Sequence, residues 1–266
     1  IFVSGYRLGM LVGGALALAL ADAIPWRAVY LVMSCGMVVG AATTLLCREP
    51  SIDAPPPRSL KEAVVAPFVD FFRRRGAWTV LAFVLLYKIG DQMASAMTTP
   101  FFLDLGFSKT DIATVVKTVG MLSMIAGGVA GAFVMLRIGI RRSLWAFGFL
   151  QAGSILVFAV LAQAGRSYEL LAAAVALENL SFGMGGAAYV GYLASQTNRR
   201  FTATQYALFS SLFGVPRVLA SAPAGFIAQA LGWSGYFVFC AAAAAPGLLL
   251  LLRIAPLRGK DAGDGA

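Results

Sequence analysis

A chain of 266 residues with 59% hydrophobic residues, 12% charged residues and a net charge of +9 is too apolar to be a water-soluble globule. It has no histidine, and its cysteines, Cys35, Cys47 and Cys240, lie on apolar segments without paired spacing. These features exclude most metal sites, Ser/His and Cys/His catalysis and a disulfide framework. We therefore predict an all-α polytopic membrane protein that is not an enzyme and uses no metal or cofactor.

Eight apolar segments reach the roughly 20 residues that a helix needs to cross a bilayer. We expect these helices at 1–21, 26–47, 77–103, 109–136, 143–164, 168–196, 203–229 and 232–252. The chain is already apolar at Phe2, and we expect it to be the C-terminal part of a longer protein.

The connection 48–76 is much longer than the others. It opens with the proline-rich sequence SIDAPPP and continues as RSLKEAVVAPFVDFFRRRG. The apolar residues of the second part follow helical spacing, which predicts an amphipathic helix on the cytoplasmic membrane surface, with a kink at Pro67. A solvated loop is the alternative.

The basic residues gather in alternate connections. Fourteen of the 21 Lys and Arg residues lie in 48–76, in 137–142, at 199–200 or after Leu252, whereas the intervening connections hold three. This asymmetry is typical of the positive-inside rule, with the richer side and the C-terminus cytoplasmic. The net charge therefore predicts orientation in a lipid bilayer and needs no nucleic-acid partner.

Six helices after a long cytoplasmic connection are typical of the major facilitator fold, in which two six-helix bundles are joined by a central segment. We expect residues 1–47 to be the last two helices of the N-terminal bundle and 48–76 to be the linker. Residues 77–253 would be the complete C-terminal bundle, and 254–266 a cytoplasmic tail.

Small residues and prolines indicate how these helices pack. Gly127 and Gly131 have the spacing that lets two helix backbones approach closely within lipid. Pro216 and Pro223 in the helix 203–229 each remove a backbone donor, so we expect them to bend it.

Lys88, Asp91 and Gln92 lie in the middle of the predicted helix 77–103. A charge at the bilayer midplane costs about 2.5 to 3.5 kcal/mol, so these side chains must face protein or water. Lys88 and Asp91 are three residues apart and share a helix face. The pair is either an internal ion pair that fixes helix packing or part of a substrate or proton site.

Further polar residues lie inside the predicted helices of the second bundle: Lys117, Glu178, Asn179, Gln205 and Arg217. The intramembrane cations of this bundle exceed the acids by one, which favours an anionic substrate. For Glu178 two interpretations stay open. It is a permanent partner of Arg217 or Lys117, or it is an acid that takes up and releases a proton.

Three stretches carry a specific resemblance. KIGDQMASAMTTPFFLDLGFSKTDIATVVKTVG (88–120), ENLSFGMGGAAYVGYLASQTNRRFTATQYALFSSL (178–212) and PAGFIAQALGW (223–233) resemble the AmpG-type muropeptide permeases of Gram-negative bacteria. The resemblance covers essentially the whole chain. It implies a secondary transporter in the bacterial inner membrane that uses a proton gradient to import anhydro-muropeptides from periplasm to cytoplasm for peptidoglycan recycling and β-lactamase induction. The expected partners are that substrate, the proton and the bilayer, and we expect a monomer.

This substrate consists of N-acetylglucosaminyl anhydro-N-acetylmuramic acid with or without a stem peptide. Its carboxylates would meet Lys88 or Arg217, and its hydroxyls and amides would meet Gln92, Asn179 and Gln205. Asp91 and Glu178 are the candidates for proton coupling. A related permease for another amphiphilic anion, such as an acyl-CoA, and a membrane scaffold without transport activity are the alternatives.

Overall fold

The structure, a computed structural model, describes residues 24–46, 60–74, 76–197, 202–212 and 214–256, together with Gly9, Leu20 and Ala21. For residues 60–64, 202 and 203 it describes the backbone alone. The chain forms two compact units, 1–55 and 56–266. Most of the predicted helix 1–21, the proline-rich part of the linker and most of the predicted tail lie outside the described residues, so the count of eight helices and the domain boundaries stay predictions.

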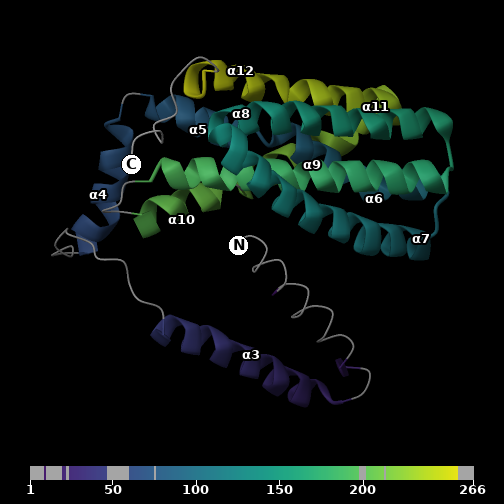
Figure 1. Ribbon diagram of the computed structural model, residues 1–266. Coiled ribbons are helices and arrows are strands. Elements are labelled where there is room, and N and C mark those ends of the chain that lie inside the picture. Colours follow the sequence, from purple (N-terminus) through teal and green to yellow (C-terminus); the bar gives the residue numbers. More distant parts are fainter. Residues whose placement is uncertain are drawn as a thin grey trace. The chain divides into compact units, whose positions relative to one another are not determined.

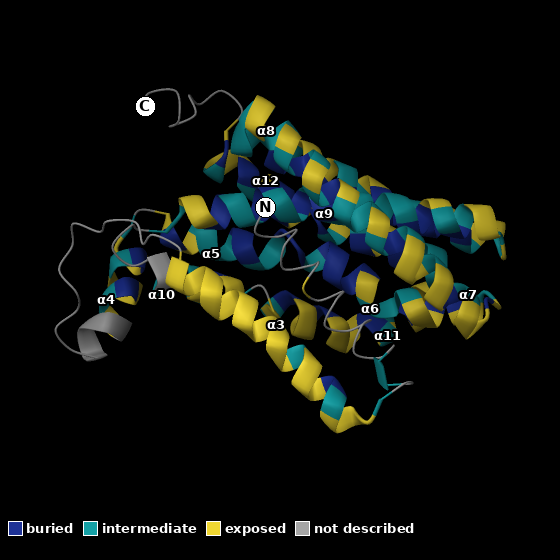
Figure 2. Ribbon diagram, turned by 60° about the horizontal axis from the view of Figure 1, so that its bottom comes forward, coloured by how far each residue is buried: buried dark blue, intermediate teal, exposed yellow. Residues whose placement is uncertain are grey.

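In the first unit, α3 (Trp26–Leu46) confirms the predicted span 26–47. Its 21 residues are long and apolar enough to cross a membrane. Most of its residues are exposed, as the colouring of Figure 2 shows, and the apolar residues Tyr30, Met37 and Leu45 are among them. A helix that is apolar all round is stable only in lipid or against other apolar helices.

The second unit is a bundle of helices. Figure 1 shows α5, α6, α8, α9, α11 and α12 running along the bundle, with α4 and α10 at one end and α7 at the other. The elements are α4 (Leu60–Phe72), α5 (Ala77–Leu86), α6 (Ile89–Asp104), α7 (Lys109–Thr114), the π-helix η2 (Val115–Gly120), α8 (Met121–Ala164), α9 (Tyr168–Ser195), α10 (Thr202–Leu212), α11 (Gly214–Ala243) and α12 (Ala245–Ile254).

Two glycines divide the longest helices where the sequence predicts connections. Gly139 in α8 has φ 79° and ψ 161°, and Gly232 in α11 has φ 68° and ψ 171°. A positive φ is accessible to glycine because it has no Cβ atom. These glycines separate the predicted helix 109–136 from 143–164, and 203–229 from 232–252.

The contacts of α8 with α9 show that the two parts of α8 run in opposite directions. Along the first part the contact partner moves forward on α9, and along the second part it moves backward. The pairs are, in the order of α8, Gly127 with Leu180, Gly131 with Met184, Gln151 with Gly185 and Ser154 with Ser181. The reversal within α8 therefore lies at the connection predicted between 109–136 and 143–164.

The predicted helix 77–103 is interrupted, which corrects the sequence interpretation. Tyr87 and Lys88 lie between α5 and α6, and the Lys88 backbone has the non-helical angles φ −103° and ψ 0°. The Tyr87 hydroxyl donates a hydrogen bond to the Leu144 carbonyl at 2.9 Å. Gly247 of α12 abuts the Tyr87 backbone so closely that a Cβ atom would lie 2.5 Å from the Tyr87 Cα. Contacts with other helices therefore surround the interruption on two sides.

The predicted helix 203–229 corresponds to α10, which is described to Leu212, and to the first part of α11, which is described from Gly214; residue 213 lies outside the described residues. Pro216 is a buried residue of α11. Pro223 lies inside α11. The bends expected at the two prolines stay predictions.

The apolar core consists of two clusters. One contains Phe101 and Phe237, whose rings meet edge to face at 4.8 Å, and the other contains Phe83 and Tyr189. Tyr87 belongs to the second cluster and Met93 to the first. The interruption after α5 therefore lies between the two clusters, where polar groups displace fewer apolar contacts.

The glycine spacing on α8 has the predicted packing role. A Cβ atom at Gly131 would lie 2.7 Å from the Met184 Cα, and one at Gly127 would overlap the Leu180 carbonyl. Gly183 of α9 faces Gly127 in return. These glycines allow α8 and α9 to approach backbone to backbone, a contact that any larger side chain would push apart.

The linker segment 60–72 forms the predicted helix. In α4, Phe71 is buried and packs edge to face on Phe209 of α10, with ring centroids 5.0 Å apart. Phe68 and Phe72 are exposed. The helix thus divides its apolar side chains between the bundle and its outer surface, and its predicted place on the membrane surface stays a prediction.

We predict that Gly127→Ala lowers the free energy of unfolding by about 1–3 kcal/mol, because the new methyl group overpacks the contact with Leu180. Gly153→Ala is the matched control. Gly153 is an exposed glycine of the same helix with open space around it, and the same change there should stabilise the protein by about 0.5–1 kcal/mol. Thermal unfolding of the purified full-length protein measures both, and equal melting temperatures for the two variants would contradict the close packing of α8 on α9.

Candidate functional site

Lys88 and Asp91 form a buried ion pair at the start of α6. The Lys88 Nζ lies 3.1 Å from Asp91 Oδ2, and the two side chains are 0% and 5% exposed. Lys88 is the residue before α6 and Asp91 is in its first turn. The helix dipole favours a carboxylate there, so the interruption after α5 gives Asp91 a position that an unbroken helix would not offer.

Other helices complete the surroundings of the Lys88 ammonium group. Gln151 of α8 accepts a hydrogen bond from it through Oε1 at 2.7 Å. The ring centroid of Phe182 on α9 lies 4.9 Å from Nζ, within the range of a cation–π contact. Gly185, also on α9, leaves room for these groups, since a Cβ atom there would lie 2.7 Å from Gln151 Oε1. The cation is thus enclosed by α6, α8 and α9.

Gln151 is only partly satisfied in this arrangement. Its Oε1 accepts from Lys88, whereas its Nε2 is buried with no hydrogen-bond partner among the described residues. A buried donor without a partner costs about 1–3 kcal/mol. The conformation therefore carries an energetic cost at the centre of the polar cluster.

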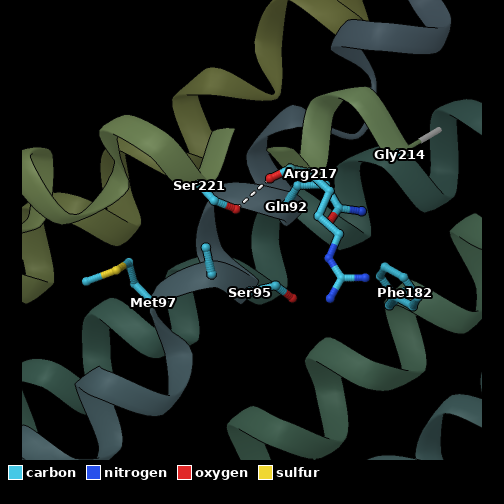
Figure 3. Close-up of a pocket in the computed structure, with 8 residues that line it drawn as sticks. Gln92, Ser95, Met97, Phe182, Gly214, Arg217 and Ser221 are labelled. Carbon is cyan, nitrogen blue, oxygen red and sulfur yellow. Dashed lines mark hydrogen bonds between the residues drawn. The ribbon is translucent and has the colours of Figure 1, made fainter. Parts of the chain in front are cut away.

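A cavity of about 650 Å³ lies beside this cluster. Its lining combines polar and apolar side chains: Gln92, Ser95, Ala96, Met97, Phe182, Gly214, Arg217 and Ser221. In Figure 3 the Arg217 side chain extends into the cavity, with its guanidinium group between Ser95 and Phe182 in that view. Ser221 Oγ donates to the Arg217 backbone carbonyl oxygen at 2.5 Å, and the guanidinium group faces the cavity.

The structure brings some of the predicted site residues together. Gln92 and Arg217 line the cavity, and the neighbouring residue of Gln92 is Asp91 of the buried pair. Glu178 is half-buried on α9, one turn before Phe182, and interacts electrostatically with Lys88 and Asp91. These residues form one polar region made by α6, α9 and α11.

Other predicted residues lie at the edge of this region or outside it. Asn179 is half-buried, and its Nδ2 donates to the Val175 carbonyl at 2.9 Å, close to Gly120 of η2. Lys117 is an exposed residue of η2. Among the described residues, Glu178 forms no ion pair with Arg217 or Lys117, so the structure does not show the permanent partner that the sequence allows.

Gln205 does not have the substrate-binding position that the sequence predicts. It is buried on α10, where its Nε2 donates to Asp70 Oδ2 at 2.9 Å and to the Pro67 carbonyl at 3.0 Å. Arg74 joins the same group through Asp70 at 2.5 Å and the Gln196 carbonyl at 2.7 Å. Gln205 therefore helps to hold α4 on the bundle and does not line the cavity, a long-range pairing that sequence position alone does not reveal.

Sequence reasoning missed two residues of the site, Gln151 and Phe182. Gln151 carries a signal, because it is an amide in an apolar span, although, like Gln205, it lies nearer a helix end than Lys88 does. Phe182 carries none, since a phenylalanine is an ordinary residue of an apolar helix.

The sequence matches a family of transporters and is similar to related bacterial proteins. The profile of the Major Facilitator Superfamily matches residues 1–221. The anhydromuropeptide permease of Escherichia coli K12 is 43% identical over 254 residues, which cover 95% of this chain and 52% of that protein. An uncharacterized protein of Haemophilus influenzae is 40% identical over 273 residues, covering 98% of this chain and 64% of that protein. The chain thus spans about half to two thirds of the length of these relatives.

We predict that removing either partner of the buried pair alone, by Lys88→Met or Asp91→Leu, lowers the free energy of unfolding by about 3–5 kcal/mol, because the remaining charge stays buried without a counter-charge. The double variant should recover most of this loss. Denaturant unfolding of all four proteins measures the coupling between the two positions. Losses that simply add in the double variant would contradict the ion pair.

Proposed function

The chain belongs to the Major Facilitator Superfamily, and from this premise we propose that it is part of a proton-driven importer of anhydro-muropeptides in the bacterial inner membrane. Family membership favours a transporter over an enzyme, and the similarity to a permease named for anhydromuropeptides supports the substrate class. The import direction, the role in peptidoglycan recycling, the cytoplasmic C-terminus and the monomeric state belong to the proposal.

The observation that carries this proposal is the Arg217 guanidinium group in the cavity. A guanidinium group binds carboxylates through paired hydrogen bonds, and the proposed substrate carries carboxylates on its peptide. The Gln92 amide and the hydroxyls of Ser95 and Ser221 can bind sugar hydroxyls and acetamido groups. Phe182 offers an apolar face for a sugar ring. The lining has the mixture of one charge, several polar groups and apolar walls that a site for a charged glycopeptide requires.

Asp91 and Glu178 are the proposed proton-coupling residues. Lys88 would link them to the substrate, because its ammonium group could bind either Asp91 or a substrate carboxylate. In this conformation Lys88 is bound to Asp91 and cannot reach the cavity. A substrate carboxylate that met Lys88 in another conformation would compete with Asp91, which could then take up a proton. Asn179 would join the binding site at its edge. Gln205 is not included, because it binds α4.

A permease for a different amphiphilic anion, such as an acyl-CoA, is the second candidate. Met97, Ala96 and Phe182 form an apolar wall beside Arg217, and such a site would also accept an acyl chain beside a phosphate. Competition between the two ligand classes for uptake distinguishes these candidates. A membrane scaffold without transport would show no uptake of either ligand.

We predict that vesicles carrying the full-length protein accumulate labelled anhydro-muropeptide when the outside is made more acidic than the inside. Arg217→Gln should raise the apparent KM for uptake about 10- to 100-fold, as expected from the loss of a hydrogen bond to a charged group worth about 1.5–3 kcal/mol. Initial rates over a range of substrate concentrations measure this change.

The matched control is Arg253→Gln. This change removes the same charge from an exposed position in the last turn of α12, away from the cavity, and should leave the KM unchanged. Gradient-driven uptake that is equally affected by both substitutions would contradict the role of Arg217. The absence of uptake by the wild-type protein, with or without a gradient, would overturn the substrate assignment.

A further inference from the structure

Phe182 belongs to two environments at once. It lines the cavity together with Gln92 and Arg217, and its ring lies 4.9 Å from the buried Lys88 Nζ. Lys88 itself is fully buried and does not line the cavity. The aromatic ring is therefore a described group that lies between the cavity and the ammonium group.

The position of Phe182 on α9 is consistent with such a boundary. Glu178, Phe182 and Gly185 follow one another at intervals of four and three residues, so they share one face of the helix. On that face, Gly185 provides the space for Gln151 and Lys88, and Phe182 adjoins the cavity. One helix face therefore contacts both the buried pair and the cavity.

Some hydrogen-bond donors around the buried Lys88–Asp91 pair lack a full set of acceptors. The buried Nε2 of Gln151 has no hydrogen-bond partner among the described residues. The Lys88 ammonium group has three protons, and Asp91 and Gln151 accept hydrogen bonds from it, while the Phe182 ring provides a weaker cation–π contact. Admission of water or a substrate oxygen from the cavity would satisfy these donors better.

We infer that Phe182 is the gate between the substrate cavity and the buried Lys88–Asp91 pair. With the ring against Lys88 the pair is closed off, and when the side chain changes rotamer the ammonium group faces the cavity. A carboxylate bound near Arg217 could then bind to Lys88 in place of Asp91, so that the occupant of the cavity determines whether the pair stays closed. This use of the gate rests on the proposed transport function.

The gate is tested by the reactivity of a thiol placed behind it. Gln151→Cys in the full-length protein is treated with a small water-soluble methanethiosulfonate, and the adduct at position 151 is located by peptide mass spectrometry, which distinguishes it from Cys35, Cys47 and Cys240. We expect slow modification with Phe182 in place and modification several times faster with Phe182→Ala. Phe182→Leu, which keeps more apolar volume, should give a rate between the two.

Ser95→Cys is the control for access to the cavity, because Ser95 lies on its wall. Its modification should be fast with Phe182, Leu or Ala at position 182. Rates at position 151 that are equal in these three backgrounds, while Ser95→Cys reacts fast, would overturn the gate. The leucine variant keeps the test valid if the alanine variant fails to fold.

No substrate enters this experiment. A wrong substrate assignment would therefore leave the labelling result unchanged, and the uptake measurement would show that error separately.

Discussion

The burial of the Lys88 ammonium group is the constraint on which the centre of this structure depends. A cation that is buried away from water must be neutralised and hydrogen-bonded by the protein. Here the contacting groups come from three helices: Asp91 on α6, Gln151 on α8 and Phe182 on α9. The interruption before α6 places Asp91 in a first helical turn, where its charge is favoured. Gly185 allows α9 to come close enough to enclose the pair.

Lys88 and Arg217 are two cations of the second unit that lie in opposite environments. Lys88 is enclosed and bound to a carboxylate, whereas the Arg217 guanidinium group extends into a cavity and forms no ion pair among the described residues. An unpaired cation within an apolar protein favours an anionic ligand, whereas an enclosed ion pair favours close packing of the helices that carry it. The close position of the two environments, with Phe182 between them, suggests how binding in the cavity could alter the pair.

Part of this arrangement follows from the sequence. Three-residue spacing places Lys88 near Asp91, and the structure shows an ion pair there. Small-residue spacing predicts a close helix contact at Gly127 and Gly131, and the structure shows these glycines packed on α9. Glycine marks the non-helical points inside α8 at Gly139 and inside α11 at Gly232. These features are local, so residue type and spacing are sufficient to show them.

The rest depends on contacts between distant segments. The interruption at Tyr87 and Lys88 has no proline or glycine of its own and is packed against Leu144 and Gly247. Gln205 has the appearance of a polar residue inside a span, yet it binds α4, some 135 residues earlier in the chain. Hydropathy and helical periodicity contain no information about such partners.

We propose that occupation of the Arg217 cavity is coupled to proton uptake at the buried pair. The most direct measurement is the pH change inside liposomes containing the full-length protein when anhydro-muropeptide is added outside. The account predicts internal acidification with the wild-type protein, and none with Asp91→Asn although this variant still binds the substrate. Equal acidification with both proteins would contradict it.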